Sequence, residues 1–83
     1  MDVRLTAAAR QTMMDLNEPI LTRITRVLER LGNWPAISGA KPLTGPLAGH
    51  FRVRTGDYRV QFYVKGQAVI VEKIGHRDGF YED

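Results

Sequence analysis

Residues 51–62, FRVRTGDYRVQF, decide the fold of this chain, because two runs of alternating apolar and polar side chains flank a short turn. Such alternation is typical of β-strands, in which successive side chains point to opposite faces of a sheet. The sequence Thr-Gly-Asp at residues 55–57 forms a turn of hairpin type. The stretch therefore predicts an antiparallel hairpin with one apolar face, which a second layer must cover.

A third strand is predicted at residues 68–74, after a turn at Lys65-Gly66. This run is rich in β-branched residues, as expected near the middle of a sheet. Residues 3–5 are too short to classify and could form a brief strand. Residues 33–49 are punctuated by Pro and Gly, which indicates a loop, and its large apolar residues are expected to anchor it to the core (Trp34, Ile37 and Leu43).

Two helices are predicted to supply the covering layer. The second carries an apolar stripe at the 3.6-residue period (Ile20, Leu21, Ile24, Val27, Leu28 and Leu31). Gly32 is expected to end it, because glycine tolerates the left-handed conformation. The first helix follows an N-cap at Thr6, continues an apolar face at Met13, Met14 and Leu16, and is interrupted at Pro19. The predicted class is α+β: an N-terminal helical hairpin packed on a small antiparallel sheet, a meander.

Length and composition narrow the possible functions. Eighty-three residues allow one compact domain, 1–83, with a thin margin of stability. The formal net charge is 12 − 9 = +3, which weakly favours polyanionic partners. The absence of cysteine excludes disulfides, thiolate metal sites and thiolate catalysis, and the two histidines lie too far apart for a metal site on one element. With no apolar stretch of about 20 residues and no signal peptide, we expect a cytoplasmic protein that needs no cofactor, metal or membrane.

Basic side chains gather on one face of the predicted sheet. Alternation places His50, Arg52 and Arg54 opposite the apolar face, and Arg59 should join them from the next strand. Like charges so close together destabilise a sheet unless something compensates, and a phosphate backbone would do so through bidentate contacts. The alternative is a solvated face that acidic residues neutralise (Asp57, Glu72 or Glu82-Asp83).

The segment 75–81, GHRDGFY, follows the last strand directly, so its polar groups are expected to lie beside the same sheet. His76 could transfer a proton near neutral pH, Arg77 could stabilise a phosphorane, and Tyr81 could stack on a base or donate a proton. A lone loop histidine is more often incidental. Tyr81 could also cap the core, a role that fits Phe80 better.

Three groups of residues together match one known family. They are Leu43-Thr44-Gly45, the block at residues 51–60, and Ile74-Gly75-His76-Arg77 with Tyr81. Over essentially its whole length the chain resembles the RelE/ParE toxin superfamily of bacterial type II toxin–antitoxin systems, and so the RelE-like fold is expected. RelE-like members cut mRNA in the ribosomal A site, whereas ParE-like members poison DNA gyrase without this catalytic set.

The resemblance favours the RelE-like branch, a ribosome-dependent mRNA endonuclease (mRNA interferase). By position it implies that Arg52, Arg54, Arg59, Arg77 and Tyr81 do the work, with the ribose 2′-OH attacking the adjacent phosphate in a metal-free reaction. Better-known nuclease members carry lysine at one or both positions filled by Arg52 and Arg54. Since arginine is a poor base, His76 or Tyr81 would have to serve, and a His50/His76 acid–base pair is a further alternative.

On the predicted second helix, Arg23, Arg26 and Arg30 share one flank. The flank is either simply solvated or docks onto ribosomal RNA, as the family's mode of action would require. The resemblance also implies a cognate antitoxin that wraps the toxin, with operator DNA bound only through the toxin–antitoxin complex. Two other functions remain open from the sequence: a gyrase inhibitor, and a toxin-like binding module whose activity has decayed.

Overall fold

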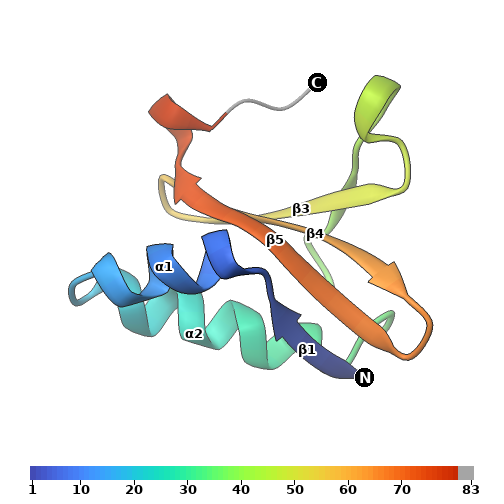
Figure 1. Cartoon of the computed structure of the whole chain (residues 1–83), viewed down its shortest axis with the longest axis horizontal. Coiled ribbons are helices and arrows are strands. Elements are labelled where there is room, and N and C mark those ends of the chain that lie inside the picture. The colour runs from blue at the N-terminus through green and yellow to red at the C-terminus, as the bar shows by residue number, and fades with distance from the viewer. Residues whose placement is uncertain (81–83) are drawn as a thin grey trace.

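The computed structural model describes residues 1–80 of the chain. These residues form a five-stranded sheet in the order β1-β5-β4-β3-β2, and two helices lie against one of its faces (Figure 1). The helices are α1 (Ala7–Asp15) and α2 (Ile20–Leu31), and two 3-10 turns are η1 (Gly45–Leu47) and η2 (Arg77–Gly79). The strands are β1 (Asp2–Leu5), β2 (Lys41–Pro42), β3 (His50–Thr55), β4 (Tyr58–Lys65) and β5 (Ala68–His76). The predicted α+β class and helical hairpin are confirmed.

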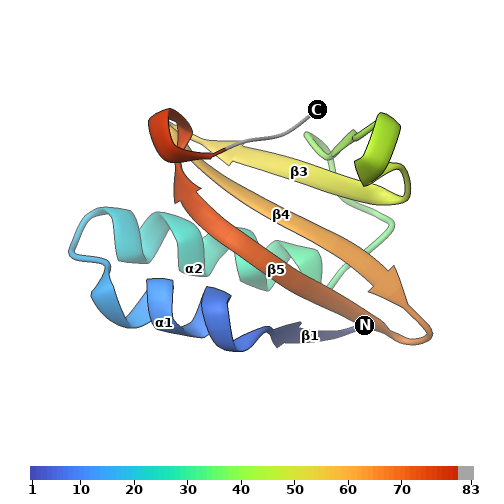
Figure 2. The same ribbon diagram turned by 45° about the horizontal axis from the view of Figure 1, so that its top comes forward.

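The sheet is larger than the predicted three-stranded meander. β3, β4 and β5 are antiparallel neighbours as expected, but β1 pairs parallel to β5 and β2 pairs antiparallel to β3. Figure 2 shows β1 lying beside β5 at one edge of the sheet. The backbone N–H of Thr6 donates to the carbonyl oxygen of Val71 at 3.0 Å, which extends the parallel pairing into the start of α1. The short β1 is therefore held by a strand far away in the sequence.

Two expectations for the helices were wrong in detail. Met14 is 73% exposed, because the buried face of α1 contains positions 9, 13 and 16, spaced by four and three residues. Gly32 ends α2 as predicted, but its φ of −62° is right-handed rather than left-handed, because the chain continues in turns through residue 34. The N-cap at Thr6 is confirmed, since its hydroxyl oxygen accepts from the backbone N–H of Ala9 at 3.2 Å.

The core lies between the helices and the sheet. The stripe of α2 is buried at Ile24, Val27 and Leu31, which pack with fully buried residues of the three long strands (Val53, Val60, Phe62, Val69 and Val71). The loop after α2 is anchored as predicted, because the Trp34 ring lies 4.7 Å from Phe51 and 5.3 Å from Phe62 between centroids. No helix within residues 1–80 is long and apolar enough to cross a membrane. The opposite face of the sheet carries most of the polar side chains.

Candidate functional site

The outer face, defined here as the side of the sheet opposite α1 and α2, brings polar side chains of five strands into three rows. Strand pairing sets these rows, because residues opposite one another on neighbouring strands project to the same side. The first row lies next to the β3–β4 turn (Arg54, Arg59 and Gly75), the second crosses four strands (Lys41, Arg52, Gln61 and Lys73), and the third reaches β1 (His50, Tyr63, Ile70 and Arg4).

The three predicted sheet arginines lie on this one face, so their placement is confirmed. Arg54 and Arg59 stand directly opposite each other across β3 and β4, at a spacing of about 5 Å between Cβ atoms. Arg54 is exposed, Arg59 is half-buried, and Arg52 is only 5% exposed. Lys41, which was not singled out from the sequence, pairs with Arg52 in register and extends the positive charge to β2. The row can bind an anion by charge-assisted hydrogen bonds.

A carboxylate also reaches the outer face. Glu72 contacts the Nδ1 atom of His50 and accepts a hydrogen bond from Nε2 of Gln61 at 3.1 Å. The side chains of His50 and Glu72 are 27% and 22% exposed. From the sequence, Glu72 was expected only to neutralise charge, and His50 to belong to the basic face that binds RNA or to form an acid–base pair with His76. The structure instead makes Glu72 the centre of a polar cluster with His50 and Gln61, which we call the His50 cluster.

A β-bulge brings Glu72 to this face. Gln61 pairs with Lys73 and the next residue, Phe62, pairs with Val71, so that Glu72 is the extra residue on β5. The bulge keeps Val71 and Ile74 in the core although they are three residues apart. That spacing of buried residues, 69, 71 and then 74, is the sequence signal that could have revealed the bulge, because a regular strand buries every second residue.

The segment after β5 lies beside the first row only in part. The backbone N–H of Arg77 donates to the carbonyl oxygen of Asp57 at 2.8 Å, which holds η2 against the β3–β4 turn. The guanidinium of Arg77 is 61% exposed, with Nε 3.9 Å from Asp57 and 3.8 Å from Asp78. Arg77 therefore adjoins the arginine end of the sheet, as predicted. The predicted role of Tyr81 falls outside the described residues.

His76 does not lie where the sequence analysis placed it. It is the last residue of β5 and pairs in register with Tyr58, so alternation sends it to the helix side of the sheet. Its ring packs edge-on against Tyr58 with 5.3 Å between centroids, and its Nδ1 accepts from the backbone N–H of Asp78 at 3.1 Å. The expected His50/His76 pair is therefore wrong, because the two residues lie on opposite faces and at opposite ends of the strands.

Phe80 is buried, but not in the core beneath the sheet. A Cβ atom on Gly75 would lie 3.3 Å from Phe80 Cδ2, and the Nζ atom of Lys73 lies 4.4 Å from the Phe80 ring centroid. Both neighbours belong to the outer face by register. The expectation that Phe80 caps the core is thus corrected: it packs on the outer face at the arginine end, in close contact with Gly75.

The helix arginines Arg23, Arg26 and Arg30 are all exposed, and they lie on the helix layer rather than on the outer face. Arg30 donates from Nη2 to the carbonyl oxygen of Ser38 at 2.7 Å. Arg23 reaches the β3–β4 turn, where its Nη1 lies 3.5 Å from the position of a Cβ on Gly56. The positive charge of α2 therefore meets that of the outer face at this turn.

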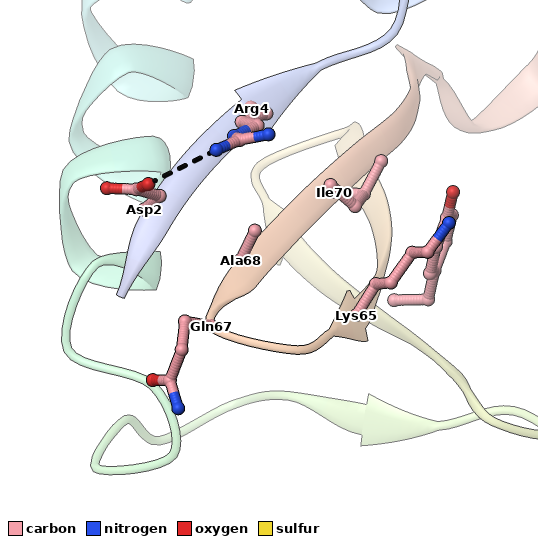
Figure 3. A pocket seen from close by; sticks show the side chains of 7 residues that line it. Asp2, Arg4, Lys65, Gln67, Ala68 and Ile70 are labelled. Atoms are coloured by element: carbon pink, nitrogen blue, oxygen red, sulfur yellow. Dashed lines mark hydrogen bonds and ion pairs between the residues drawn. The ribbon is translucent and has the colours of Figure 1, made fainter.

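A shallow pocket of about 410 Å³ lies at the other end of the outer face. Figure 3 shows Asp2 and Arg4 of β1 on one side of it, with Ala68 and Ile70 on β5 and Lys65 beyond them. Tyr63 also lines the pocket, and the centroid of its ring is 5.2 Å from that of His50. Tyr63 therefore lies between the pocket and the His50 cluster.

Comparison with known proteins points to one superfamily. The family model of the ParE toxin of type II toxin–antitoxin system, parDE, matches residues 3–79. The RelBE2 toxin–antitoxin complex of Mycobacterium tuberculosis contains a chain with 30% identity and a TM-score of 0.78, covering 92% of this chain and 90% of that one.

Two further solved structures share the fold. The isolated E. coli RelE toxin has 16% identity and a TM-score of 0.75, with 90% and 82% of the two chains covered. The toxin of the RelB-RelE complex from Methanococcus jannaschii has 21% identity and a TM-score of 0.73, with 89% of each chain covered. No curated protein sequence matches the chain.

Proposed function

The chain belongs to the ParE toxin family of type II toxin–antitoxin systems, within the RelE/ParE superfamily, and we propose that it is a ribosome-dependent mRNA endonuclease. The observation that carries the proposal is the outer face, where Arg54 of β3 and Arg59 of β4 stand opposite each other on the side of the sheet away from α1 and α2. Arg77 adjoins them at the β3–β4 turn. Such a surface suits a single RNA strand, whose phosphates are regularly spaced anions.

The residue types suit metal-free cleavage through the ribose 2′-OH. In that reaction the 2′-oxygen attacks the neighbouring phosphorus in line, the bond to the 5′-oxygen breaks, and negative charge builds up on the phosphorane. Arg59 and Arg77 would stabilise this charge, while Arg54 would hold the RNA backbone. Arg52, being buried, would add charge from beneath the phosphate rather than by direct contact. Tyr81 would stack on a base or transfer a proton.

Two kinds of partner follow from the same proposal. The Mycobacterium tuberculosis and Methanococcus jannaschii relatives were solved as toxin–antitoxin complexes, and we propose a cognate antitoxin for this chain as well. Operator DNA would be bound only through that complex. The exposed helix arginines Arg23, Arg26 and Arg30 would contact ribosomal RNA, and Arg23 is the one that lies next to the sheet site.

A matched pair of arginine variants tests the activity. The wild type, Arg77→Ala and Arg10→Ala are each induced briefly in growing cells, and transcript 5′ ends are mapped. Arg10 is also exposed but lies on α1, on the opposite side of the molecule from the outer face. We expect cuts with a codon-phase bias for the wild type and Arg10→Ala, and none for Arg77→Ala. Intact transcripts with the wild type would refute the endonuclease.

The match to the ParE model supports a second candidate, a gyrase inhibitor. A gyrase inhibitor would act through surface helices, cause DNA damage and leave transcripts uncut. The same induction experiment therefore separates the functions: an SOS response with intact transcripts indicates gyrase inhibition. A chain that produces neither response would be a toxin-like binding module.

A further inference from the structure

The endonuclease proposal leaves one chemical role without a residue among residues 1–80, that of the base that deprotonates the 2′-OH. Arginine stays protonated at any physiological pH, so the arginines of the outer face cannot fill the role. His76 lies on the wrong side of the sheet. Tyr81 lies outside the described residues, so within residues 1–80 we look for the base among the other residues that share the face of the arginines.

His50 meets this requirement in position. It lies on the outer face one alternate position before Arg52, at a spacing of about 7 Å along β3. Its side chain is partly exposed, and Tyr63 connects it to the pocket described above. The pocket offers room for a nucleoside on the far side of Tyr63 from the imidazole, and its lining combines this aromatic side chain with Arg4, Lys65 and the carboxylate of Asp2. The imidazole thus lies between a phosphate-binding row and a space of nucleoside size.

Glu72 determines which nitrogen of His50 can act. A carboxylate can only accept a hydrogen bond, so Nδ1 of His50, which contacts it, carries the ring proton. In the neutral imidazole Nε2 is then unprotonated and can accept a proton. Gln61 donates to the same carboxylate and holds it in place. Glu72 reaches the outer face only because it is the extra residue of the β-bulge, so its contact with His50 depends on this local distortion of β5. Bulges often redirect a side chain next to an active site.

We infer that His50 is the general base of this site and that Glu72 is its positioning residue. The inference rests on the proposed endonuclease function and deepens it. Nε2 of His50 takes the proton from the 2′-OH as the 2′-oxygen bonds to phosphorus and the bond from phosphorus to the 5′-oxygen breaks. The leaving 5′-oxygen takes a proton from water, and His50 returns its proton to solvent. The products are a 2′,3′-cyclic phosphate and a 5′-hydroxyl end.

Cleavage of mRNA on programmed ribosomes by the purified full-length toxin tests the base directly. General base catalysis contributes about 10²–10⁴-fold, so His50→Ala should lower kcat by at least about 100-fold with a small change in KM. Added imidazole should restore part of the cleavage rate of His50→Ala. It should restore none of the rate of Arg77→Ala, because that variant lacks a guanidinium rather than an imidazole. Arg10→Ala serves as the matched control and should cut at the wild-type rate.

A spectroscopic measurement tests the positioning role of Glu72 independently of any cleavage assay. Correlation of the ring nitrogens and protons of His50 by NMR should show the proton on Nδ1 in the wild type, and a shift of population to Nε2 in Glu72→Ala. Loss of Glu72 should lower kcat by about 10–100-fold, as for other groups that orient a histidine. If His50→Ala folds poorly, His50→Gln provides a second variant with a side chain of similar size.

The outcomes separate this inference from the function on which it rests. If His50→Ala and His50→Gln cut at the wild-type rate while Arg77→Ala is inactive, the endonuclease stands and the base is not His50. An effect confined to KM would make His50 an RNA contact and overturn the inference. A proton on Nε2 in the wild type would overturn the role of Glu72. If wild-type toxin leaves ribosome-bound mRNA intact, both proposals fail.

Discussion

The β-bulge at Glu72 leads to a prediction that can be worked out residue by residue. Deleting Glu72 would leave Val69, Val71 and Ile74 in regular alternation, because Lys73 would then follow Val71 directly. Every buried residue of β5 would keep its face. The deletion should therefore produce a straight strand with the same core, although it removes a residue from the middle of the sheet.

The expected stability follows from comparison with the point variant Glu72→Ala. Both changes remove the carboxylate and its hydrogen bond from Gln61, so their unfolding free energies should agree within about 0.5 kcal/mol. Deleting Ile70 instead would turn Val69 or Val71 toward the outer face, and both are fully buried. Exposing one valine costs roughly 1.5–3 kcal/mol, which lowers the Tm of a domain of this size by about 6 °C or more.

Thermal and urea unfolding of the three full-length variants, followed by circular dichroism, would measure these differences. The reasoning predicts that the deletion of Glu72 and Glu72→Ala unfold together, and that the deletion of Ile70 unfolds well below both. If the Glu72 deletion proves as unstable as the Ile70 deletion, the bulge is needed for the fold itself, and the account of it as a device for placing Glu72 is refuted.

Three further predictions address the site, the core and a helix end. Arg54→Ala and Arg59→Ala should each weaken single-stranded RNA binding and reduce the slope of log K against log salt by about 0.7, as measured by fluorescence titration at several salt concentrations, because each removes one phosphate contact. Phe62→Ala should lower the unfolding free energy by about 3–5 kcal/mol in urea, since its side chain is fully buried. Hydrogen bonds from the hydroxyl and backbone N–H of Thr22 hold the pKa of Glu18 below its ordinary value of 4.5. A lowered folded-state pKa stabilises the fold above the ordinary value and loses that effect as the pH falls, so the Tm difference between wild type and Glu18→Gln should shrink on acidification.

Each of these three predictions has a control or an outcome that would contradict it. Arg10→Ala should change RNA binding only slightly, and an equal loss for Arg10→Ala and Arg54→Ala would show that net charge, not the outer face, determines binding. A loss below about 1 kcal/mol for Phe62→Ala would contradict the position of the core. A Tm difference for Glu18→Gln that stays constant from pH 7 into the acid range would contradict the hydrogen bonding of that carboxylate.

The parts of the fold predicted from sequence are those with a local, repeated signal. The stripe of α2 and the alternation in residues 51–62 each extend over several repeats, so the hairpin, the helices and the outer face with Arg52, Arg54 and Arg59 were predicted correctly. Pairing of β1 with β5 was not predicted, because four residues carry little pattern and their partner lies more than 60 positions away.

The errors in the site have a common physical cause. The position of a side chain on a strand depends on counting residues, and one extra residue sends every later side chain to the other face. His76 was placed on the outer face because it is adjacent to Arg77 in the sequence, without counting residues along β5. Glu72 was treated as an isolated charge. Lys41 belongs to a two-residue strand with no alternation to detect, so only pairing with β3 reveals its place beside Arg52.

Parallel pairing of β1 with β5 has a consequence for the order of assembly during synthesis. β1 has no partner strand until β5 has left the ribosome, and until then the apolar side of α1 also lacks the strand against which it mainly packs. Completion of the sheet is thus a late, long-range step. A nascent chain without β5 thus leaves β1 unpaired and one edge of β4 open.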